Sequence, residues 1–429
     1  MRKIPPVIIA ILLMFSCAQA AVCFRADDAY YLLNADGAVI APSGYYSDIQ
    51  PLGDDLFAAK QNDLYALINF EGVRYTAFEY NEMKPAGDGN ILIRKGQNWG
   101  VMDSSGAVLH KCAYSNILPS GTGAYWVFAG SRNDLHADPM LVLRADGGIT
   151  GTGIRVLDAD TTLGSGLMRA LLAEENLYGY IDTTGKIAID AQFDYAGCFT
   201  GGVACVVQNG KYGVIDTDGK FILAPEYDWI ALSPAGGILA LTADGNTALY
   251  NSSGKLIRQK QADYAGFYGA YAYMTGDTST LVFNADGDQI LTLSANAGMQ
   301  TGIGDDLILM DGTWGEECVY LYGSERKYQN IYPLGTAADA RIYAYMTINA
   351  ARYNNDLLGE IQYSTDPASA RYGLIDSSGE IRITAQYRSI EYLQDDRFCV
   401  RTDDQWQMID SSGNVYFSCA AADEESSSE

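Results

Sequence analysis

The stretch KYGVIDTDGKFILAPEYD, residues 211–228, contains the pattern that repeats along most of this chain. An apolar run, Tyr212–Ile215, leads into the turn Asp216–Gly219, and a second apolar run follows the turn and ends at Pro225. Six copies of the turn share an Asp or Asn, two polar residues and a glycine, and they end at Gly106, Gly185, Gly219, Gly254, Gly379 and Gly413. Looser copies end at Gly37, Gly72 and Gly287.

The turns recur at a nearly constant spacing. Gly185 and Gly219 are 34 residues apart, and Gly219 and Gly254 are 35 apart. A fixed period in this range is typical of tandem-repeat architectures. Aromatic residues keep the same register, seven positions before the glycine at Tyr30, Tyr65, Trp99, Tyr178, Tyr212, Tyr372 and Trp406. We therefore expect about eleven units of about 34 residues between Tyr30 and Phe417.

Each position of the repeat has a physical role. The Asp or Asn opens a type I turn by accepting hydrogen bonds from the backbone two residues on, and the glycine supplies the positive φ that closes a hairpin. A third apolar stretch, such as Val203–Val207, follows about a dozen residues after the hairpin. The sequence therefore predicts a three-stranded unit. The glycine after the aromatic residue, as in Tyr212-Gly213, is expected to let a neighbouring ring or backbone lie against the strand, and an aromatic–glycine contact between adjacent hairpins is the hypothesis.

The predicted fold is all-β, with the units closed into a β-propeller-like ring, because closure removes exposed sheet edges. An open β-solenoid or superhelical array of hairpins is the alternative. The repeats are predicted over residues 21–346 and 371–417, separated by an insertion loop at 347–370 that is expected to contact a partner. Residues 418–429 are acidic and rich in serine, and this composition predicts a disordered tail.

Residues 1–20 have the pattern of a secretory signal peptide. Arg2 and Lys3 precede the apolar run Val7–Phe15, which is too short to span a bilayer, and Ala18-Gln19-Ala20 fits a cleavage site. The mature protein is therefore expected to be secreted or held at the cell surface, with a lipoprotein anchored at Cys17 as the alternative. No later segment is long and apolar enough to predict an integral membrane span.

Composition limits the classes of partner. The formal net charge of −25 argues against nucleic-acid binding and against anionic membranes, since both need a basic surface. The cysteines show neither CxxC nor zinc-ligand spacing, and Cys205 and Cys399 are expected to be buried free thiols. One hypothesis joins the two ends of the array through a disulfide between Cys23 and Cys419.

The segment around Tyr212-Gly213, with its turn and the following Pro225-Glu226-Tyr227, resembles the WG repeat, also called the KWG repeat. The Trp-Gly pair of that family is present literally at Trp99-Gly100, and tyrosine replaces the tryptophan in the copies at 178–179, 212–213 and 372–373. Similar proteins are bacterial, are often secreted or attached to the surface, and generally lack an assigned activity. The resemblance implies an all-β repeat array and brings no catalytic residues with it.

The sequence contains few candidates for catalysis. Its two histidines, His110 and His136, are outside any metal-binding motif, and no phosphate-binding loop or GxSxG elbow is present. The turn Asp216–Gly219 lacks the distal acids of an EF-hand, so we expect no metal site. The chain is predicted to be non-enzymatic and to need no cofactor.

Aromatic residues outside the repeat register are the candidate binding residues, because exposed rings anchor recognition. They are Trp126, Trp229, Tyr271, Tyr273 and Trp314, with Tyr45, Tyr46 and Tyr268 as further members of the same class. The function predicted from the sequence is an exported scaffold for protein–protein interaction with an unidentified partner. Binding of cell-wall or host glycans through these rings is the alternative, and a glycosidase with paired carboxylates is a minor one.

Overall fold

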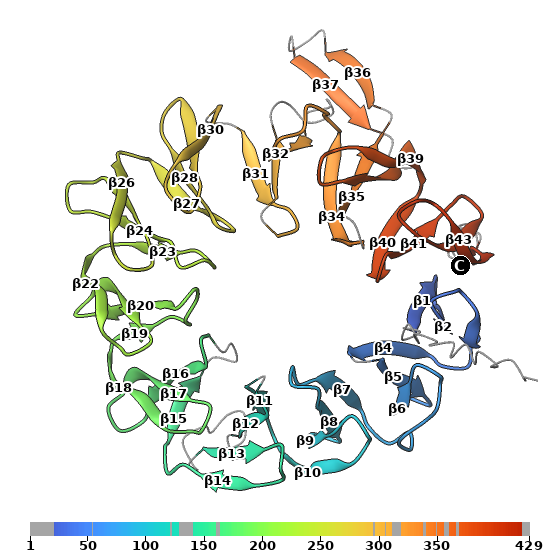
Figure 1. The fold of residues 1–429 in the computed structure, drawn as a ribbon, viewed down its shortest axis with the longest axis horizontal. Helices are drawn as coiled ribbons and strands as arrows, with labels where there is room; N and C mark the ends of the chain where they lie inside the picture. The colour runs from blue at the N-terminus through green and yellow to red at the C-terminus, as the bar shows by residue number, and fades with distance from the viewer. Residues whose placement is uncertain are drawn as a thin grey trace, which may run out of the picture.

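The protein forms a closed ring of eleven small antiparallel sheets, the blades of a β-propeller, around an open centre (Figure 1). The computed structural model describes residues 21–422 except 54, 121, 128–139, 160–163, 295–296, 305, 311–318, 338–339, 349, 356–359 and 366–368. The predicted signal peptide, residues 1–20, therefore lies outside the described residues. The all-β, propeller-like prediction is confirmed, and the open solenoid is not the arrangement found.

The blades follow one another in chain order. Blades 1 to 3 comprise β1 (Val22–Ala26), β2 (Ala29–Leu33), β3 (Val39–Ala41); β4 (Asp48–Gly53), β5 (Leu56–Gln61), β6 (Leu64–Asn69); and β7 (Glu82–Pro85), β8 (Ile91–Lys95), β9 (Asn98–Met102), β10 (Val108–Tyr114). Blades 4 to 6 comprise β11 (Ile117–Pro119), β12 (Ala124–Val127), β13 (Leu141–Arg144), β14 (Ile149–Gly151); β15 (Val156–Ala159), β16 (Leu167–Leu172), β17 (Leu177–Asp182), β18 (Ile187–Phe193); and β19 (Tyr195–Ala196), β20 (Val203–Gln208), β21 (Lys211–Asp216), β22 (Phe221–Tyr227).

Blades 7 to 9 comprise β23 (Ile230–Leu232), β24 (Ile238–Leu241), β25 (Thr247–Tyr250), β26 (Leu256–Lys260); β27 (Tyr264–Tyr268), β28 (Tyr271–Thr275), β29 (Ser279–Phe283), β30 (Gln289–Ser294); and β31 (Gly298–Thr301), β32 (Leu307–Met310), β33 (Val319–Leu321). Blade 10 comprises β34 (Asn330–Thr336), β35 (Arg341–Thr347), β38 (Arg371–Asp376) and β39 (Ile381–Tyr387), with the hairpin β36 (Ala350–Asn355) and β37 (Glu360–Thr365) inserted. Blade 11 comprises β40 (Ser389–Gln394), β41 (Arg397–Arg401), β42 (Gln405–Ile409) and β43 (Val415–Ala420).

The typical blade has four strands, so the prediction of three-stranded units is corrected. The strand that the sequence did not reveal is the first of each blade, which is as short as two residues in β19 and three in β23. Such strands are too short to show an alternating pattern. Among the described residues, blade 1 has no such first strand, because its turn 34–37 connects β2 and β3 and β1 therefore takes the second position.

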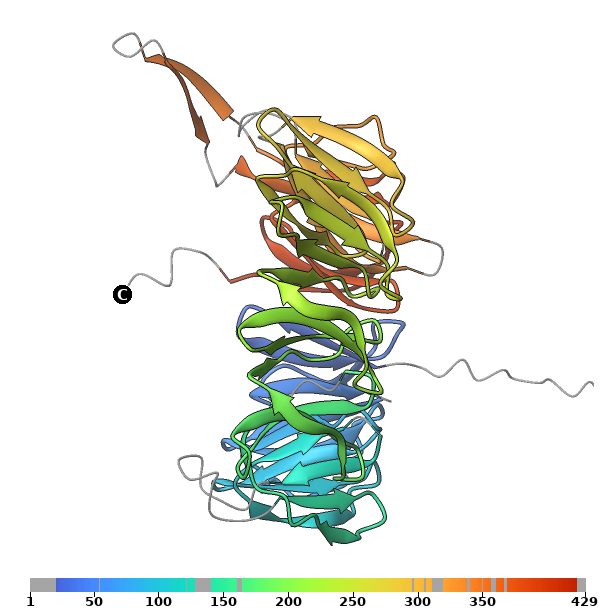
Figure 2. The ribbon, with the colours of Figure 1, turned by 90° about the vertical axis from the view of Figure 1, so that its left-hand side faces the viewer.

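The antiparallel order gives the ring two distinct faces. The glycine turns between third and fourth strands, and the connections between first and second strands, lie at one face, which we name the turn face. The connections between second and third strands, and those between blades, lie at the other, which we name the hairpin face. The inserted hairpin β36–β37 extends from the hairpin face of blade 10 (Figure 2). The insertion at 347–370, predicted as a loop, thus contains two paired strands.

The repeated turns have the geometry that their residues require. In the third blade, the carboxylate oxygen Oδ1 of Asp103 accepts hydrogen bonds from the backbone N–H groups of Ser105 and Ala107, both at 2.9 Å. The glycine that closes the turn has positive φ in all six copies, between 77° at Gly254 and 87° at Gly106. The acid is thus held by its own turn.

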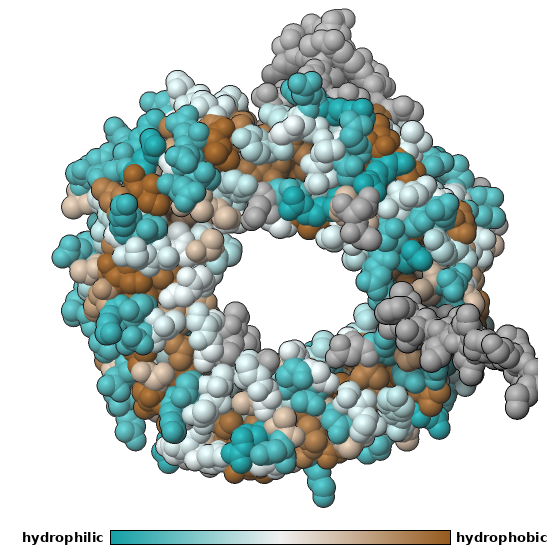
Figure 3. Space-filling model, viewed as in Figure 1, coloured by the Kyte–Doolittle hydropathy of each residue, from teal (hydrophilic) through white to brown (hydrophobic). Residues whose placement is uncertain are grey.

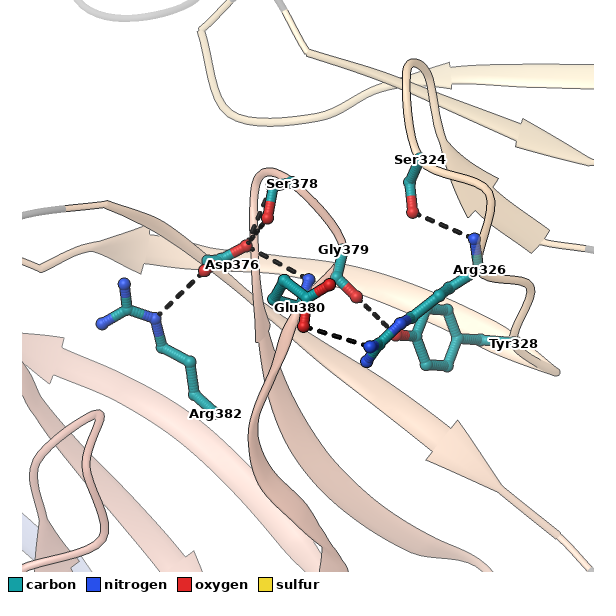
Figure 4. Close-up of polar contacts among 8 residues, drawn as sticks. All are labelled: Ser324, Arg326, Tyr328, Asp376, Ser378, Gly379, Glu380 and Arg382. Carbon is teal, nitrogen blue, oxygen red and sulfur yellow. Dashed lines mark hydrogen bonds and ion pairs between the residues drawn. The ribbon is translucent and has the colours of Figure 1, made fainter.

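The turn glycines also let each blade pack closely against the preceding one. A Cβ on Gly219 of blade 6 would stand 2.9 Å from Cγ2 of Ile189 in the outer strand of blade 5, and Gly254 is seated in the same way on Ile222. Figure 4 shows the corresponding contact between blades 9 and 10, where the Tyr328 hydroxyl donates to the carbonyl oxygen of Gly379 at 2.7 Å. The glycine column therefore serves packing between blades as well as turn geometry.

Two ion pairs hold the turn of blade 10 at this junction, one from blade 9 and one from within blade 10. Arg326 Nη2 lies 3.1 Å from Glu380 Oε2, and Arg382 Nε lies 3.4 Å from Asp376 Oδ2 (Figure 4). Asp376 opens the turn and Glu380 directly follows it. Arg326 of the preceding blade and Arg382 of the outer strand therefore hold the same turn.

The glycine of the Trp-Gly or Tyr-Gly pair lets a neighbouring backbone lie against its strand, whereas the hypothesis of a ring from an adjacent hairpin is wrong at Gly213. A Cβ on Gly213 would lie 2.9 Å from the carbonyl oxygen of Leu223 and 3.0 Å from the nitrogen of Pro225, both in β22 of the same blade. The pairing of β21 with β22 shifts register at this point. The glycine therefore accommodates the backbone of a bulged outer strand, and no ring of a neighbouring hairpin is involved.

The hydrophobic core is a series of clusters between consecutive blades. One cluster joins Leu67 of blade 2 to Met83 and Ile93 of blade 3, and the others follow the same plan around the ring. Figure 3 shows apolar residues between the blades. The centre of the ring stays open when all atoms are drawn as spheres. Second strands such as β12 and β5 are consequently buried on both faces.

The ring closes where blade 1 meets blade 11. Phe24 and Phe417 pack with their ring centres 5.2 Å apart, and the backbone N–H of Ala422 donates to Asp27 Oδ2 at 2.9 Å. The guanidinium of Arg397 donates to the carbonyl oxygen of Ala35 at 3.1 Å. Side-chain packing therefore closes the ring, since all the strands of blade 1 come from one end of the chain and all those of blade 11 from the other.

The thiols at this closure are free, so the hypothesis of a disulfide between Cys23 and Cys419 is wrong. Burial, followed by the charges of Asp48 and Glu391, raises the pKa of Cys23 to about 12. Cys399 is a buried free thiol, as expected, and Cys205 is a half-buried one. The tail predicted to begin at residue 418 is ordered as far as Ala420, the last residue of β43, and residues 423–429 lie outside the described part.

The turn acids predict a specific loss of stability in acid. Burial disfavours ionisation of Asp103, Asp182 and Asp376, but hydrogen bonds within the turn outweigh it and lower the pKa of each carboxyl. A lowered pKa adds stability above the unfolded-state value of about 3.9, and this stability is lost as pH falls through the folded-state value. Asn251 makes the same turn hydrogen bonds without a charge.

The triple variant with asparagine at these three positions should therefore keep its turns and lose less stability in acid. We expect the urea midpoint of the natural chain to fall more steeply than that of the variant between pH 5 and pH 2. Parallel curves over this range would contradict the assignment.

Candidate binding surface

Three consecutive blades each begin with an aspartate followed by an exposed aromatic residue. The pairs are Asp194-Tyr195, Asp228-Trp229 and Asp263-Tyr264, in blades 6, 7 and 8. The aromatic residue stands ten positions after the turn glycine of the preceding blade in each case. The exposed fractions are 47% for Tyr195, 38% for Trp229 and 74% for Tyr264. We name these six residues the aspartate–aromatic row.

Backbone hydrogen bonds place the row on the hairpin face. The N–H of Asp194 donates to the carbonyl oxygen of Val207 at 2.9 Å, and that of Asp263 donates to Thr275 at 2.8 Å. Each aspartate therefore lies beside the end of its blade's second strand, where the chain crosses from one blade to the next. The following residue, Ala196 or Ile230, is buried, so the chain enters the blade directly after the exposed ring.

A cleft of about 320 Å³ lies between blades 7 and 8 at the row. Trp229 and Leu241 line it from blade 7, together with the small side chain of Thr247, and Asp263 and Tyr264 line it from blade 8. Thr247 occupies the position seven before the turn glycine, where most blades carry Tyr or Trp. The small residue leaves space that the repeat usually fills with a ring.

An equivalent cleft of about 430 Å³ lies between blades 3 and 4. There the repeat aromatic Trp99 is present, and Lys84 Nζ and the guanidinium carbon of Arg94 lie 5.2 and 5.7 Å from its ring centre. Glu82 pairs with Lys84, and its Oε2 lies 2.9 Å from Arg94 Nη2. Burial opposes the charge of Glu82, but both cations outweigh it and lower the pKa of this carboxyl.

The junction between blades 5 and 6 also combines rings with a cation. The guanidinium carbon of Arg169 lies 5.4 Å from the ring centre of Tyr178 and 5.7 Å from that of Tyr195. At the next junction, Lys211 pairs with Asp228 of the row. Cations of the chain thus stack on the rings and pair with the acids at these positions, which shows that the local geometry suits a positive charge.

The hairpin face is acidic around the row. Outside the inserted hairpin, every charged residue in the described connections between second and third strands is acidic: Asp27, Asp28, Asp63, Glu174, Glu175, Asp244, Asp277, Asp403 and Asp404. A surface with one sign of charge attracts a partner of the opposite sign and raises its association rate. The connections between second and third strands are therefore complementary to a basic partner, although Arg155 and Arg388 lie in connections between blades on the same face.

The structure separates the aromatic residues that the sequence grouped together. Trp229 is exposed and lines a cleft, whereas Trp126 is only 1% exposed within the core between blades 4 and 5, so its prediction as a binding ring is corrected. Tyr271 and Tyr273 are half-buried and pack in the core between blades 8 and 9. Trp314 lies outside the described residues.

Tyr195 and Tyr264 were missed as candidate binding residues, although a signal for them exists. Both follow an aspartate and share the offset of Trp229 from the preceding turn glycine. Of the further candidates, Tyr45 is exposed and Tyr46 is buried, with their ring centres 4.7 Å apart. Tyr268 packs against Tyr273 at 5.0 Å.

The histidines and possible metal ligands are the other candidate groups for chemistry. His110 is buried, and its Nε2 lies 2.7 Å from the carbonyl oxygen of Arg144, a structural contact; His136 is outside the described residues. The described residues contain no group of three or more His, Cys, Asp or Glu side chains that could hold a metal ion. Within the same residues, no helix is long and apolar enough to cross a membrane.

Solved structures that resemble the chain do so distantly. Hsv2 from Kluyveromyces lactis shares 12% identity over 66% of this chain and 95% of its own, with a TM-score of 0.27. BamB from Moraxella catarrhalis shares 15% identity over 62% and 90%, with a TM-score of 0.26. The dihydro-heme d1 dehydrogenase NirN in complex with DHE shares 13% identity over 64% and 72%, with a TM-score of 0.28. Scores this low carry no argument about function.

No curated protein matches the chain. The family described as WG containing repeat matches at residues 178–212, 212–240 and 372–406. These segments begin at Tyr178, Tyr212 and Tyr372, the aromatic residues that precede the bulge glycines, and they run through the turns of blades 5, 6 and 10. Residues 178–240 and 372–406 of this chain are therefore repeats of the WG type.

Proposed function

We propose that this protein is an exported, non-enzymatic scaffold that binds a protein partner through its hairpin face. The aspartate–aromatic row carries the proposal, because exposed aromatic rings at matching positions of three adjacent blades supply large, rigid contact area. The inserted hairpin β36–β37 extends from the same face and enlarges the surface that a partner can reach (Figure 2).

A structural role for the repeated acids supports the non-enzymatic assignment. The carboxylates of the turns accept hydrogen bonds from their own backbone, as Asp182 does from Thr184 and Lys186 at 2.8 and 3.0 Å. The most regular acids of the chain are thereby used in holding the turns. Export is supported by the sequence pattern of residues 1–20, with the lipoprotein form at Cys17 as the alternative.

The proposal is tested by capture from the cell envelope and medium of the source organism. The mature chain from Ala21 is immobilised beside three variants: one lacking residues 349–368, one with Trp229→Ala and Tyr264→Ala, and a control with Tyr322→Ala. Tyr322 is 43% exposed at the turn of blade 9, on the opposite face. The scaffold assignment predicts one protein retained by the natural chain and the control and reduced by both other variants. Equal retention by all four would contradict binding through the hairpin face.

Glycan binding is the second candidate, and the periodic placement of Tyr195, Trp229 and Tyr264 favours it, because rings at a regular interval suit a repeating polymer. Retention on isolated cell wall that survives protease but not glycan digestion would support this alternative. The minor alternative, a glycosidase, predicts turnover of a mixed polysaccharide panel, and the scaffold assignment predicts none.

A further inference from the structure

The clefts between blades 3 and 4 and between blades 7 and 8 are built from corresponding positions. The residue ten after the preceding turn glycine is Glu82 in the first and Trp229 in the second. The second strand contributes Arg94 to one cleft and Leu241 to the other. The two clefts can therefore be compared position by position.

The groups present in the first cleft are redistributed in the second, with one omission. Thr247 stands in the second cleft where Trp99 stands in the first. The rings of the second cleft, Trp229 and Tyr264, come from other positions. The carboxylate moves from Glu82 to Asp263. The cation has no replacement, because none of the residues lining the cleft between blades 7 and 8 is Lys or Arg.

The neighbouring junctions contain cations of the chain itself. Arg169 stacks on Tyr178 and Tyr195 between blades 5 and 6, and Lys211 pairs with Asp228 between blades 6 and 7. Among the described residues, Asp263 forms no ion pair and no cation of the chain stacks on Tyr264, unlike Asp228 and Tyr195. Lys260 is the basic residue opposite Thr247 in the pairing of β25 with β26. Its side chain is exposed and does not line the cleft.

We propose that the cleft formed by Trp229, Asp263 and Tyr264 binds an arginine or lysine side chain of the partner protein. The two rings provide cation–π contacts, the carboxylate provides the opposite charge, and the cavity of about 320 Å³ has room for a guanidinium with part of its stem. The acidic hairpin face steers such a partner towards the cleft. This inference rests on the proposed scaffold function and names the chemistry that the partner must present.

The experiment uses fluorine NMR on the full mature chain labelled with 5-fluorotryptophan, with the Trp229 resonance assigned from the Trp229→Phe variant. The probe is N-acetyl-Gly-Arg-Gly amide, and the neutral comparison is the same peptide with citrulline in place of arginine. The proposal predicts a saturable shift of the Trp229 resonance with the arginine peptide only. No shift, or the same shift with citrulline, would overturn it.

Matched variants separate the cleft from the general negative charge of the protein. Asp263→Asn and Asp218→Asn each remove one exposed carboxylate, but Asp218 lies in a turn on the opposite face. We expect Asp263→Asn or Tyr264→Ala to weaken binding of the arginine peptide roughly threefold to thirtyfold, and Asp218→Asn to leave it nearly unchanged. Equal losses for the two Asp variants would assign the binding to overall charge and refute the site.

A third variant tests whether the chain fills its own cleft. If Lys260 occupied it, Lys260→Gln would move the Trp229 resonance without peptide, and the proposal would fail; we expect no such movement. The scaffold function is judged separately by partner capture. A partner retained equally by the natural chain and Asp263→Asn would refute the cation cleft and leave the scaffold function standing.

Discussion

Substitution of Gly37 by alanine is expected to destabilise the closed ring by about 3 kcal/mol or more. Gly37 has φ of 83°, and a Cβ there would stand 2.6 Å from the carbonyl carbon of Tyr416 and closer still to its oxygen. Tyr416 belongs to the outer strand of the last blade, so the clash falls on the junction between blades 1 and 11. Backbone atoms cannot rotate away from the new methyl group, and the two blades must separate.

Gly44→Ala is the matched control for this substitution. Gly44 has φ of 79°, so alanine there pays the same backbone penalty of about 1–2 kcal/mol, but no atom lies within 4 Å of its added Cβ. Urea unfolding and hydrogen exchange of blades 1 and 11 measure the difference. Similar losses for the two variants would show that backbone conformation alone matters and that Gly37 does not seat the closure.

Trp126→Ala is expected to cost about 3–5 kcal/mol, the range for deleting a large aromatic side chain from a core. The ring is 1% exposed between blades 4 and 5, where it packs with residues such as Met168 and Ile181. Its indole Nε1 has no hydrogen-bond partner among the described residues, so Trp126→Phe loses volume but no polar contact and should cost much less. Thermal unfolding of both variants checks this order.

Trp229→Ala provides the contrast that separates the core from the surface. Because this ring keeps 38% of its surface exposed and lines an open cleft, the expected loss of unfolding free energy is smaller, about 1–2 kcal/mol. The two tryptophans are thus expected to affect different quantities, Trp126 the stability of the ring and Trp229 its binding. A large stability loss for Trp229→Ala, or a small one for Trp126→Ala, would contradict their placement.

The turns and the ring architecture could be predicted because their signals are local and repeated. The Asp, the polar pair and the glycine specify one hairpin geometry, and the period specifies a stack of equal units. The first strand of each blade could not be predicted, because β19 and β23 offer only two or three residues. Sequence also could not decide whether a ring or a backbone lies against Gly213, because the backbone atoms that do so are placed by the register shift in β22.

The candidate site was partly predictable for a related reason. Trp126 and Trp229 both lie outside the aromatic register, and sequence alone gives no means of telling a buried ring from an exposed one. Strand β12, which holds Trp126, is buried along its whole length because blades cover both of its faces. Trp229 escapes burial because it lies in a connection between blades. Tyr195 and Tyr264 could have been found from their common offset and their preceding aspartates.

Closure of the ring is the central claim, and a disulfide between positions 27 and 422 tests it most directly. The backbone nitrogen of Ala422 lies 2.9 Å from Asp27 Oδ2 although 395 residues separate them. The Asp27→Cys, Ala422→Cys variant is oxidised at low protein concentration, digested and mapped by mass spectrometry, with both single-cysteine variants as controls. A closed ring predicts rapid intramolecular linkage of Cys at the two positions while the native thiols remain reduced. Linkage only between molecules, or none, would contradict closure and favour an open array.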